Sequence, residues 1–90
     1  MNWLEFDWDE GNTDKVLVRA SKKELREAFT DPDQIDRETY TVKGEKRWTF
    51  FAKTWGGRIM FVVYTMRGDK VRAISARDAE DDEKRIYRRG

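Results

Sequence analysis

Basic side chains gather in the second half of this 90-residue chain. Between Lys46 and Arg77 there are eight basic residues and a single acidic one, Asp69. Residues 1–45 carry 7 basic and 12 acidic side chains, whereas residues 46–90 carry 12 and 6, so the formal net charge of +1 conceals halves of opposite sign. A concentrated basic region in a nearly neutral chain indicates a partner that carries phosphate groups. The alternative is an ordinary solvated surface, and charge alone does not separate the two.

The residue types that are missing exclude several kinds of chemistry. The chain has no Cys, which excludes a disulfide framework, a thiol nucleophile and cysteine-ligated zinc or iron–sulfur sites. It also has no His, the side chain most used as a general base and as a metal ligand. The acidic run Glu80–Glu83 is expected to be a charged helix start, because consecutive residues point in different directions around a helix. We therefore expect neither a metal nor a cofactor.

Length and composition indicate one small domain. Charged residues make up 41% of the chain, against about 25% in typical proteins. Four Trp, three Tyr and five Phe nevertheless supply enough apolar area for a thin core. No apolar run approaches the ~20 residues that a membrane span needs, and the N-terminus lacks the pattern of a signal peptide. We expect a cytoplasmic protein without a membrane segment.

A short strand and a first helical segment are predicted near the N-terminus. Leu4, Phe6 and Trp8 alternate with acidic residues, which predicts a half-buried strand that ends at Gly11–Asn12. The apolar run 16–18 predicts one or two helical turns.

A second helix has well-marked boundaries. Ser21 and Glu24 have the spacing of a capping box. The apolar residues that follow form one stripe, at Leu25, Ala28 and Phe29. The helix must end before Pro32, because the residue that precedes a proline is disfavoured in helical conformation.

The remaining residues predict an antiparallel sheet followed by a helix. Alternation with a period of two begins at Tyr40, and strands are expected over 46–54, 59–67 and 70–77. Gly68-Asp69 fits a two-residue hairpin that needs a positive φ. A C-terminal helix is expected over 79–89, capped by Asp78, with acidic residues near its start and basic residues near its end. The fold class is α+β: a small antiparallel sheet of three to four strands with two N-terminal helical segments and a C-terminal helix.

The two faces of the sheet can be assigned if the loop pairs Thr54 with Ile59. The core face then holds Trp48, Phe50, Ala52, Phe61, Val63, Thr65, Ile74 and Ala76, with Arg72 near its edge. The opposite face holds Arg47, Thr49, Phe51, Lys53, Met60, Val62, Tyr64, Met66, Ala73, Ser75 and Arg77, with Lys53, Met60 and Arg77 in one cross-strand row. Cations mixed with aromatic rings suit RNA, since cations bind phosphate and rings stack on bases. Alternatively the C-terminal helix covers the apolar part of this face. A register error of one residue would exchange the faces.

Several ordered segments of the chain resemble motifs of one family. They are Phe6-Asp7-Trp8-Asp9-Glu10-Gly11-Asn12 with Lys15, Glu45-Lys46-Arg47-Trp48, Gly57-Arg58-Ile59-Met60-Phe61-Val62-Val63-Tyr64-Thr65, Arg72-Ala73-Ile74-Ser75-Ala76-Arg77-Asp78-Ala79, and Glu83-Lys84-Arg85-Ile86-Tyr87. Together they resemble the signatures of the BrnT family. The resemblance implies a RelE-like ribonuclease toxin of a type II toxin–antitoxin pair, built on a small antiparallel sheet with helices.

The same resemblance implies partners. They are RNA, free or on the ribosome, and a ribbon-helix-helix antitoxin that neutralises the toxin; the complex binds operator DNA through the antitoxin. The chain departs from the family in two segments. The family often has a Lys-His pair where this chain has Arg19-Ala20, and a His-Ser pair in the region that here reads Tyr40-Thr41-Val42-Lys43-Gly44. Three hypotheses follow: an active endoribonuclease, a catalytically silent relative that binds an antitoxin or RNA, and an unrelated interaction domain.

RNA cleavage without a metal requires a base for the 2′-hydroxyl, stabilisation of charge on phosphorus and an acid for the 5′-oxygen. Arg47 and Arg77 are candidates for the second task, because guanidinium presents a planar fork of donors. Glu45, on the same side of its strand as Arg47, is a candidate base, and the alternative is a surface ion pair worth under about 1 kcal/mol. Lys53 is a second candidate base, with Arg77 as the cationic neighbour that would favour its neutral form. Tyr87 is a candidate for positioning substrate or donating a proton, or else a packing residue.

Further residues are predicted to contact RNA or a partner. The RNA-binding candidates are Lys15, Arg58, Tyr64 and Arg72. Trp55, in a Gly-Gly turn, is the tryptophan most expected to be exposed, whereas Trp3 and Trp8 suit either the core or a partner surface.

Overall fold

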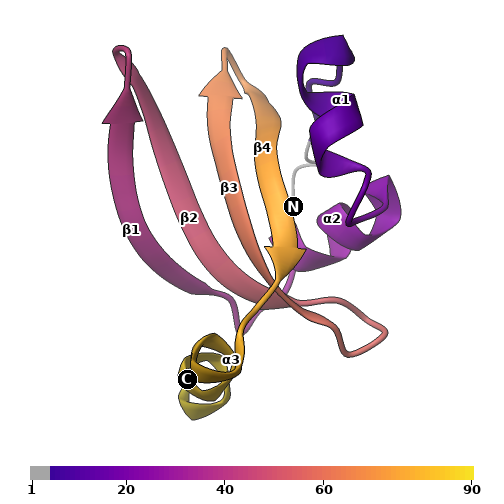
Figure 1. The fold of residues 1–90 in the computed structure, drawn as a ribbon, viewed down its shortest axis with the longest axis vertical. Helices are drawn as coiled ribbons and strands as arrows, with labels where there is room; N and C mark the ends of the chain where they lie inside the picture. Colours follow the sequence, from indigo (N-terminus) through magenta and orange to yellow (C-terminus); the bar gives the residue numbers. More distant parts are fainter. Residues whose placement is uncertain (1–4) are drawn as a thin grey trace.

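A computed structural model describes residues 5–90, which form a four-stranded antiparallel sheet and three helices (Figure 1). The elements in order are α1 (Glu10–Val16), α2 (Lys22–Phe29), β1 (Ile35–Val42), β2 (Glu45–Lys53), β3 (Ile59–Arg67), β4 (Lys70–Asp78) and α3 (Asp81–Arg89). Spatial order in the sheet follows chain order, β1-β2-β3-β4. The predicted α+β class is confirmed. The predictions for Trp3 and Leu4 lie outside the described residues.

The N-terminal segment forms less strand and more helix than its sequence predicts. The predicted strand is reduced to a single parallel bridge between Phe6 and Val71. Gly11 and Asn12 do not interrupt the structure but lie in the first turn of α1, because the Asp9 carboxylate accepts from the Gly11 amide and Asn12 Oδ1 accepts from the Asp9 amide at 2.9 Å. This capping box places the helix ahead of the predicted turns at 16–18.

The second helix has the predicted form. The Ser21 hydroxyl accepts from the Glu24 amide, and the Glu24 carboxylate accepts from the Ser21 amide, each at 3.0 Å. Leu25 and Ala28 are buried against the sheet, and Phe29 packs beside them. Its end at Phe29 precedes Pro32 as expected.

The hairpin between β2 and β3 corrects the predicted register. Thr54 pairs with Arg58, since the Thr54 amide donates to the Arg58 carbonyl at 2.9 Å and the Thr54 hydroxyl accepts from the Arg58 amide at 3.1 Å. The loop therefore contains three residues, 55–57, and Gly57 closes it at a φ of 92°. Lys53, not Thr54, pairs with Ile59.

A β-bulge in β4 adds a second shift of one residue. Tyr64 pairs with Ala73 but Val63 pairs with Ser75, so Ile74 is the extra residue. Met60, Val62, Tyr64 and Ala73, predicted on the open face, share the helix-covered face with Phe50. Phe61, Val63 and Thr65, predicted on the core face, lie on the face of Arg47. The predicted row of Lys53, Met60 and Arg77 does not form. Ser75 and Arg77 lie on the predicted face, because beyond Ile74 the one-residue shift at the β2–β3 loop and the one-residue shift at the bulge cancel.

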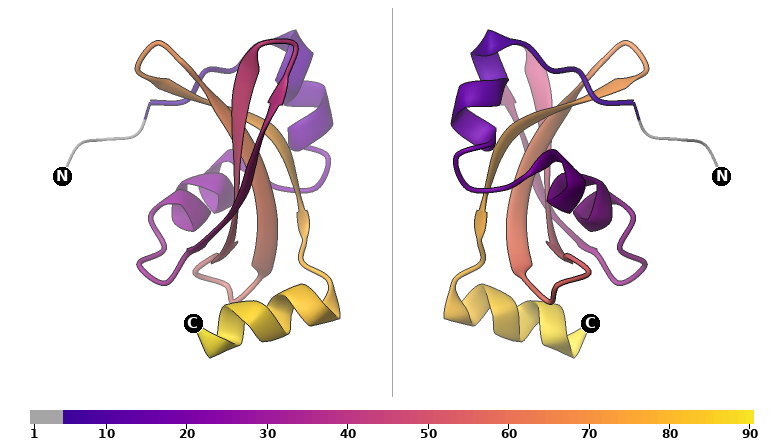
Figure 2. Two further views of the ribbon diagram at one scale, coloured as in Figure 1. Left: turned by 90° about the vertical axis from the view of Figure 1, so that its left-hand side faces the viewer. Right: turned by 90° about the vertical axis from the view of Figure 1, so that its right-hand side faces the viewer.

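The main core lies between the sheet and the two N-terminal helices (Figure 2). Its buried side chains are Val16, Ala20, Leu25, Ala28, Phe50, Ala52, Met60, Val62, Ala73 and Ala76. Trp8 is partly buried against this core, whereas Trp55 is 82% exposed as predicted.

A second, smaller core holds α3 across one end of the sheet, as Figures 1 and 2 show. Tyr87 and Ala79 pack there with Phe51 and Ile59. The helix begins at Asp81 with Glu80 as its N-cap, two residues later than predicted. The Ala79 amide donates to the Ile59 carbonyl at 2.9 Å, which prolongs the strand pairing and delays the helix.

Candidate functional site

Side chains from both N-terminal and sheet segments surround an open cavity of about 500 Å³. Its lining residues, here called the basic hollow, are Lys15, Arg19, Tyr40, Arg47, Val63, Ile74, Ser75 and Ala76. Tyr40 and Arg47 are direct neighbours across β1 and β2, and Val63 pairs with Ser75 across β3 and β4. The β4 bulge explains why three consecutive residues, 74–76, reach the same cavity, since a bulge breaks the strict alternation of a strand.

The helix that carries Lys15 is fixed to the sheet edge by polar contacts. Arg72 on β4 donates to Asp7 at 3.1 Å and to Asp9, the N-cap of α1, at 2.9 and 3.0 Å. These bonds raise the pKa of Arg72 and lower that of Asp9. Asn12 Nδ2 donates to the Ala73 carbonyl at 3.1 Å. Together they set the position of α1 beside the hollow.

Three cationic side chains, Lys15, Arg19 and Arg47, line the hollow. Within residues 5–90, neither Lys15 nor Arg19 has a carboxylate within ion-pair distance of its side chain. Arg47 makes one long ion pair with Glu45, at 3.4 Å, and its Nε is buried without a partner among the described residues. Glu45 also contacts Arg67 at 3.4 Å. Three cations therefore line one cavity, and among residues 5–90 the carboxylate that forms an ion pair with any of them is that of Glu45.

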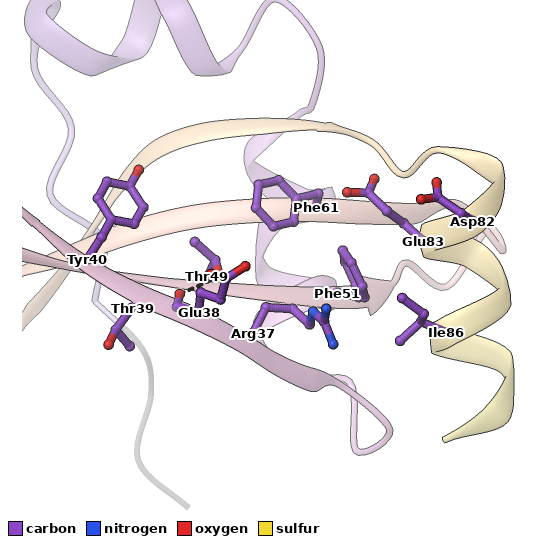
Figure 3. Close-up of a pocket in the computed structure, with 10 residues that line it drawn as sticks. All are labelled: Arg37, Glu38, Thr39, Tyr40, Thr49, Phe51, Phe61, Asp82, Glu83 and Ile86. Atoms are coloured by element: carbon purple, nitrogen blue, oxygen red, sulfur yellow. Dashed lines mark hydrogen bonds between the residues drawn. The ribbon is translucent and has the colours of Figure 1, made fainter.

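A second cavity, of about 350 Å³, lies on the same face between β1 and α3 (Figure 3). Its lining residues, here called the aromatic cleft, are Arg37, Glu38, Thr39, Tyr40, Thr49, Phe51, Phe61, Asp82, Glu83 and Ile86. Tyr40 also lines the basic hollow, so the two cavities adjoin.

The sequence profile of the BrnT family, described as the ribonuclease toxin of type II toxin–antitoxin systems, matches residues 8–83. The chain belongs to the BrnT family. A search of curated proteins finds no match. The BrnT family consists of ribonuclease toxins, and membership in a type II system implies an antitoxin partner.

The predicted catalytic residues of this BrnT chain occupy three separate places. Glu45 and Arg47 lie together beside the basic hollow. Arg77 belongs to the row of Phe51, four residues along β2 from Arg47, or about 13 Å at ~3.3 Å per residue. Its guanidinium donates twice to Glu83, at 2.7 and 3.0 Å, which raises the pKa of Arg77.

Lys53 and Tyr87 lie together at the α3 end of the sheet. Lys53 Nζ is 5.8 Å from the centroid of the Tyr87 ring. The Tyr87 hydroxyl donates to Asp31 at 2.7 Å, and burial together with this bond raises the pKa of Tyr87. These contacts join α3 to the segment that follows α2.

Among the predicted RNA-binding residues, Lys15 alone lies at the hollow. Arg58 is tied to Asp78, to Glu24 at 3.1 Å and to the Arg19 carbonyl, and its hydrogen bond to Asp78 is the main cause of its raised pKa. Arg72 is buried in its contacts with α1. Tyr64 lies on the helix-covered face, stacked on Trp48 with ring centroids 5.6 Å apart, so its predicted face is wrong.

Sequence reasoning missed Arg19, Tyr40 and Ser75 as site residues. A signal for two of them was present, since Arg19 and Tyr40 stand in the segments where the chain lacks the family's histidines. Over residues 5–90, no group of three or more His, Cys, Asp or Glu side chains is arranged to hold a metal ion. Over the same residues, no helix is long and apolar enough to cross a membrane.

Proposed function

We propose that this chain is a metal-independent endoribonuclease that cleaves mRNA at the basic hollow. The observation that carries the proposal is the convergence of Lys15, Arg19 and Arg47 on one cavity that Tyr40 also lines. A cationic concave site suits the phosphate backbone, and cations aimed at phosphorus stabilise the charge that develops there.

The proposed reaction is an internal transesterification. The 2′-hydroxyl attacks the adjacent phosphorus and loses its proton to a base, while the bond from phosphorus to the 5′-oxygen breaks and that oxygen takes up a proton. The products are a 2′,3′-cyclic phosphate and a 5′-hydroxyl. Glu45 is the proposed base, and the Tyr40 hydroxyl is the proposed acid. Arg47 spans the two, since it pairs with Glu45 and neighbours Tyr40 across the strands.

The other predicted catalytic residues receive structural roles in this proposal. Arg77, Lys53 and Tyr87 contact α3 or the residues beneath it and do not line the hollow. We assign them to holding α3 in place.

A cleavage assay in EDTA tests the proposal. Labelled single-stranded RNA is incubated with the parent protein, Arg47→Ala and Arg85→Ala; the last removes one exposed charge from α3, away from the hollow. We expect the parent and Arg85→Ala to cleave alike and Arg47→Ala to lose about 100-fold or more, the usual effect of removing a donor to the transition state. Equal cleavage by the two variants contradicts the proposed site, and cleavage that occurs without EDTA but stops in its presence contradicts metal independence.

For the partner, we propose a ribbon-helix-helix antitoxin that neutralises the chain and carries the complex to operator DNA. The family membership supports an antitoxin, and the resemblance supports this class of antitoxin. Co-purification with the product of an adjacent ribbon-helix-helix reading frame, and loss of cleavage in that complex, would support the proposal. A co-purifying antitoxin of another fold would contradict it.

A second candidate is a silent relative that binds RNA or an antitoxin without cleaving. It is favoured by the positions of Arg19 and Tyr40, which stand at the hollow in segments where the family often has histidine. Induction of the chain alone in bacteria separates the two, because an active toxin arrests growth and a silent relative does not. Arrest without cleavage of free RNA indicates an enzyme that acts on the ribosome.

A further inference from the structure

We propose that the aromatic cleft binds a nucleobase, with a preference for guanine, beside the phosphate that the basic hollow would hold. The inference rests on the proposed function and adds a substrate specificity to it. Four features of the cleft carry it: its bulged wall, its stacking surfaces, its carboxylates and its continuity with the hollow.

The wall of the cleft on β1 is a β-bulge. Asp36 pairs with Phe50 and Thr39 pairs with Trp48, so that two residues, 37 and 38, face the single Thr49. The Thr49 hydroxyl donates to the Glu38 carbonyl at 2.6 Å and holds the bulge against β2. A regular strand would send successive side chains to opposite faces, whereas here both Arg37 and Glu38 line the cleft (Figure 3).

The floor of the cleft offers stacking surfaces. The rings of Phe51 and Phe61 lie with centroids 5.7 Å apart. The Arg37 guanidinium lies 5.2 Å from the Phe51 centroid, and the Arg77 guanidinium lies 4.6 Å from that of Phe61. Single-stranded bases stack on aromatic rings and on guanidinium planes. Because the Phe51 ring is only 2% exposed, the surfaces open to the flat face of a base are the exposed Arg37 guanidinium and the partly exposed ring of Phe61.

The polar groups of the cleft suit one base edge best. Glu38, Asp82 and Glu83 line it, and Glu83 is already bonded to Arg77. An ionised carboxylate only accepts hydrogen bonds. Guanine presents two adjacent N–H donors, N1–H and N2–H, to such a group. Adenine and cytosine place an acceptor nitrogen beside their amino group, and uracil flanks its single N–H with two carbonyl oxygens, so guanine is favoured.

The cleft is continuous with the basic hollow. Tyr40 lines both cavities, and the rows of Arg47 and Phe51 are about 13 Å apart along β2, a distance that a short stretch of single strand can span. A base in the cleft would therefore fix which phosphate reaches Arg47.

The test measures binding separately from cleavage. Fluorescent 2′-O-methyl heptamers of uridine, with a central G, A, C or U, cannot be cleaved because they lack the attacking hydroxyl. Their dissociation constants are compared by anisotropy for the parent protein, Glu38→Gln and Glu10→Gln. Glu10 lies in the first turn of α1, so its variant removes the same charge outside the cleft.

We expect the parent and Glu10→Gln to bind the G heptamer roughly tenfold more tightly than the U heptamer, the discrimination typical of a bidentate contact to a base. Glu38→Gln should bind both heptamers within about twofold of each other.

Each outcome decides between the two proposals. Equal affinity for all four heptamers, no binding to any of them, or the same preference in both variants overturns the base site. If the base site is overturned but ordinary RNA is cleaved without regard to sequence, the ribonuclease proposal still holds. A preference for guanine with neither cleavage of ordinary RNA nor growth arrest on induction supports the base site and contradicts the ribonuclease. Release of the antitoxin by Glu38→Gln with unchanged base preference shows that the cleft binds protein, and overturns the inference.

Discussion

Removal of the hydroxyl group should have opposite effects at two tyrosines of this chain. At Tyr87 it should lower stability and leave cleavage unchanged, whereas at Tyr40 it should lower cleavage and leave stability unchanged. Tyr87 is 7% exposed and its hydroxyl donates to Asp31 at 2.7 Å, whereas Tyr40 is 44% exposed and lines the basic hollow. Tyr87→Phe therefore removes a buried bond to a charged acceptor and nothing from the hollow. Tyr40→Phe removes the proposed acid and no bond that holds the fold.

The expected loss of folding free energy in Tyr87→Phe depends on the hydrogen bonds that Asp31 retains. A hydrogen bond to a charged group contributes about 1.5–3 kcal/mol. Asp31 retains the backbone amides of Lys53, at 2.8 Å, and Asp33, at 2.9 Å, so its charge remains solvated and the lower value applies. We expect a loss of about 1.5 kcal/mol, or roughly 6–12 °C in Tm for a domain of this size.

The difference should also depend on pH. Burial raises the pKa of Asp31, but the hydrogen bonds from Lys53, Asp33 and Tyr87 outweigh it and the net pKa is lowered. A carboxyl with a lowered pKa in the folded state adds stability above its unfolded pKa of about 3.9, and this stability is lost as the pH falls through the folded pKa. The gap between parent and Tyr87→Phe should therefore be full at pH 7 and shrink below about pH 4.

Urea unfolding followed by tryptophan fluorescence, together with RNA cleavage, measures both variants. We expect Tyr87→Phe to be destabilised with unchanged cleavage at a temperature where it is folded, and Tyr40→Phe to be stable with cleavage reduced by about 100-fold. Stability of Tyr87→Phe within 0.5 kcal/mol of the parent, or a stability gap that does not shrink as the pH falls below about 4, would refute this reading of Tyr87 (the 0.5 kcal/mol threshold is about the smallest net value of a hydrogen bond). A loss of cleavage in Tyr87→Phe would return it to the catalytic site.

Two further predictions concern the fold. Gly68 has a φ of 62° and open space around its Cα, so Gly68→Ala should cost about 1–2 kcal/mol through backbone strain alone, whereas Gly56→Ala, without a positive φ, should be nearly neutral in thermal unfolding. Arg72→Met should lower the unfolding midpoint well beyond Arg67→Met, because Arg72 is buried and makes three bonds while the exposed Arg67 makes one contact of 3.4 Å, worth under about 1 kcal/mol. Equal midpoints in either pair contradict the corresponding argument.

Local signals predicted the elements of the fold but not its register. The capping box at Ser21 and the glycine at Gly68 act within a few residues, and both have the predicted structure. The β2–β3 register depends on whether Thr54 pairs with Arg58 or with Ile59. The hydrogen bond that the Arg58 amide donates to the Thr54 hydroxyl favours the pairing with Arg58. The sequence does not mark Ile74 as the extra residue, because the small neighbours Ala73, Ser75 and Ala76 fit either face of a strand.

Only the part of the candidate site that is local in sequence was predicted. Glu45 and Arg47 are two residues apart on one strand, so alternation alone brings them together. Lys15 and Arg19 reach Arg47 only through the packing of α1 on β4, which depends on contacts between residues about sixty positions apart, such as Asn12 with Ala73. Charge counts located the basic half of the chain but could not show that two cations from the acidic half complete the hollow.

The closure of the N-terminal segment onto β4 has a consequence for synthesis of the chain. Phe6 forms a bridge with Val71, and Arg72 donates hydrogen bonds to Asp9. The strand on which α1 packs is therefore absent until residues 71–72 have emerged from the ribosome. Because chains emerge N-terminus first and long-range pairings form late, Lys15 and Arg19 meet Arg47 only after β4 has emerged. A nascent chain from which β4 has not yet emerged therefore carries no assembled basic hollow.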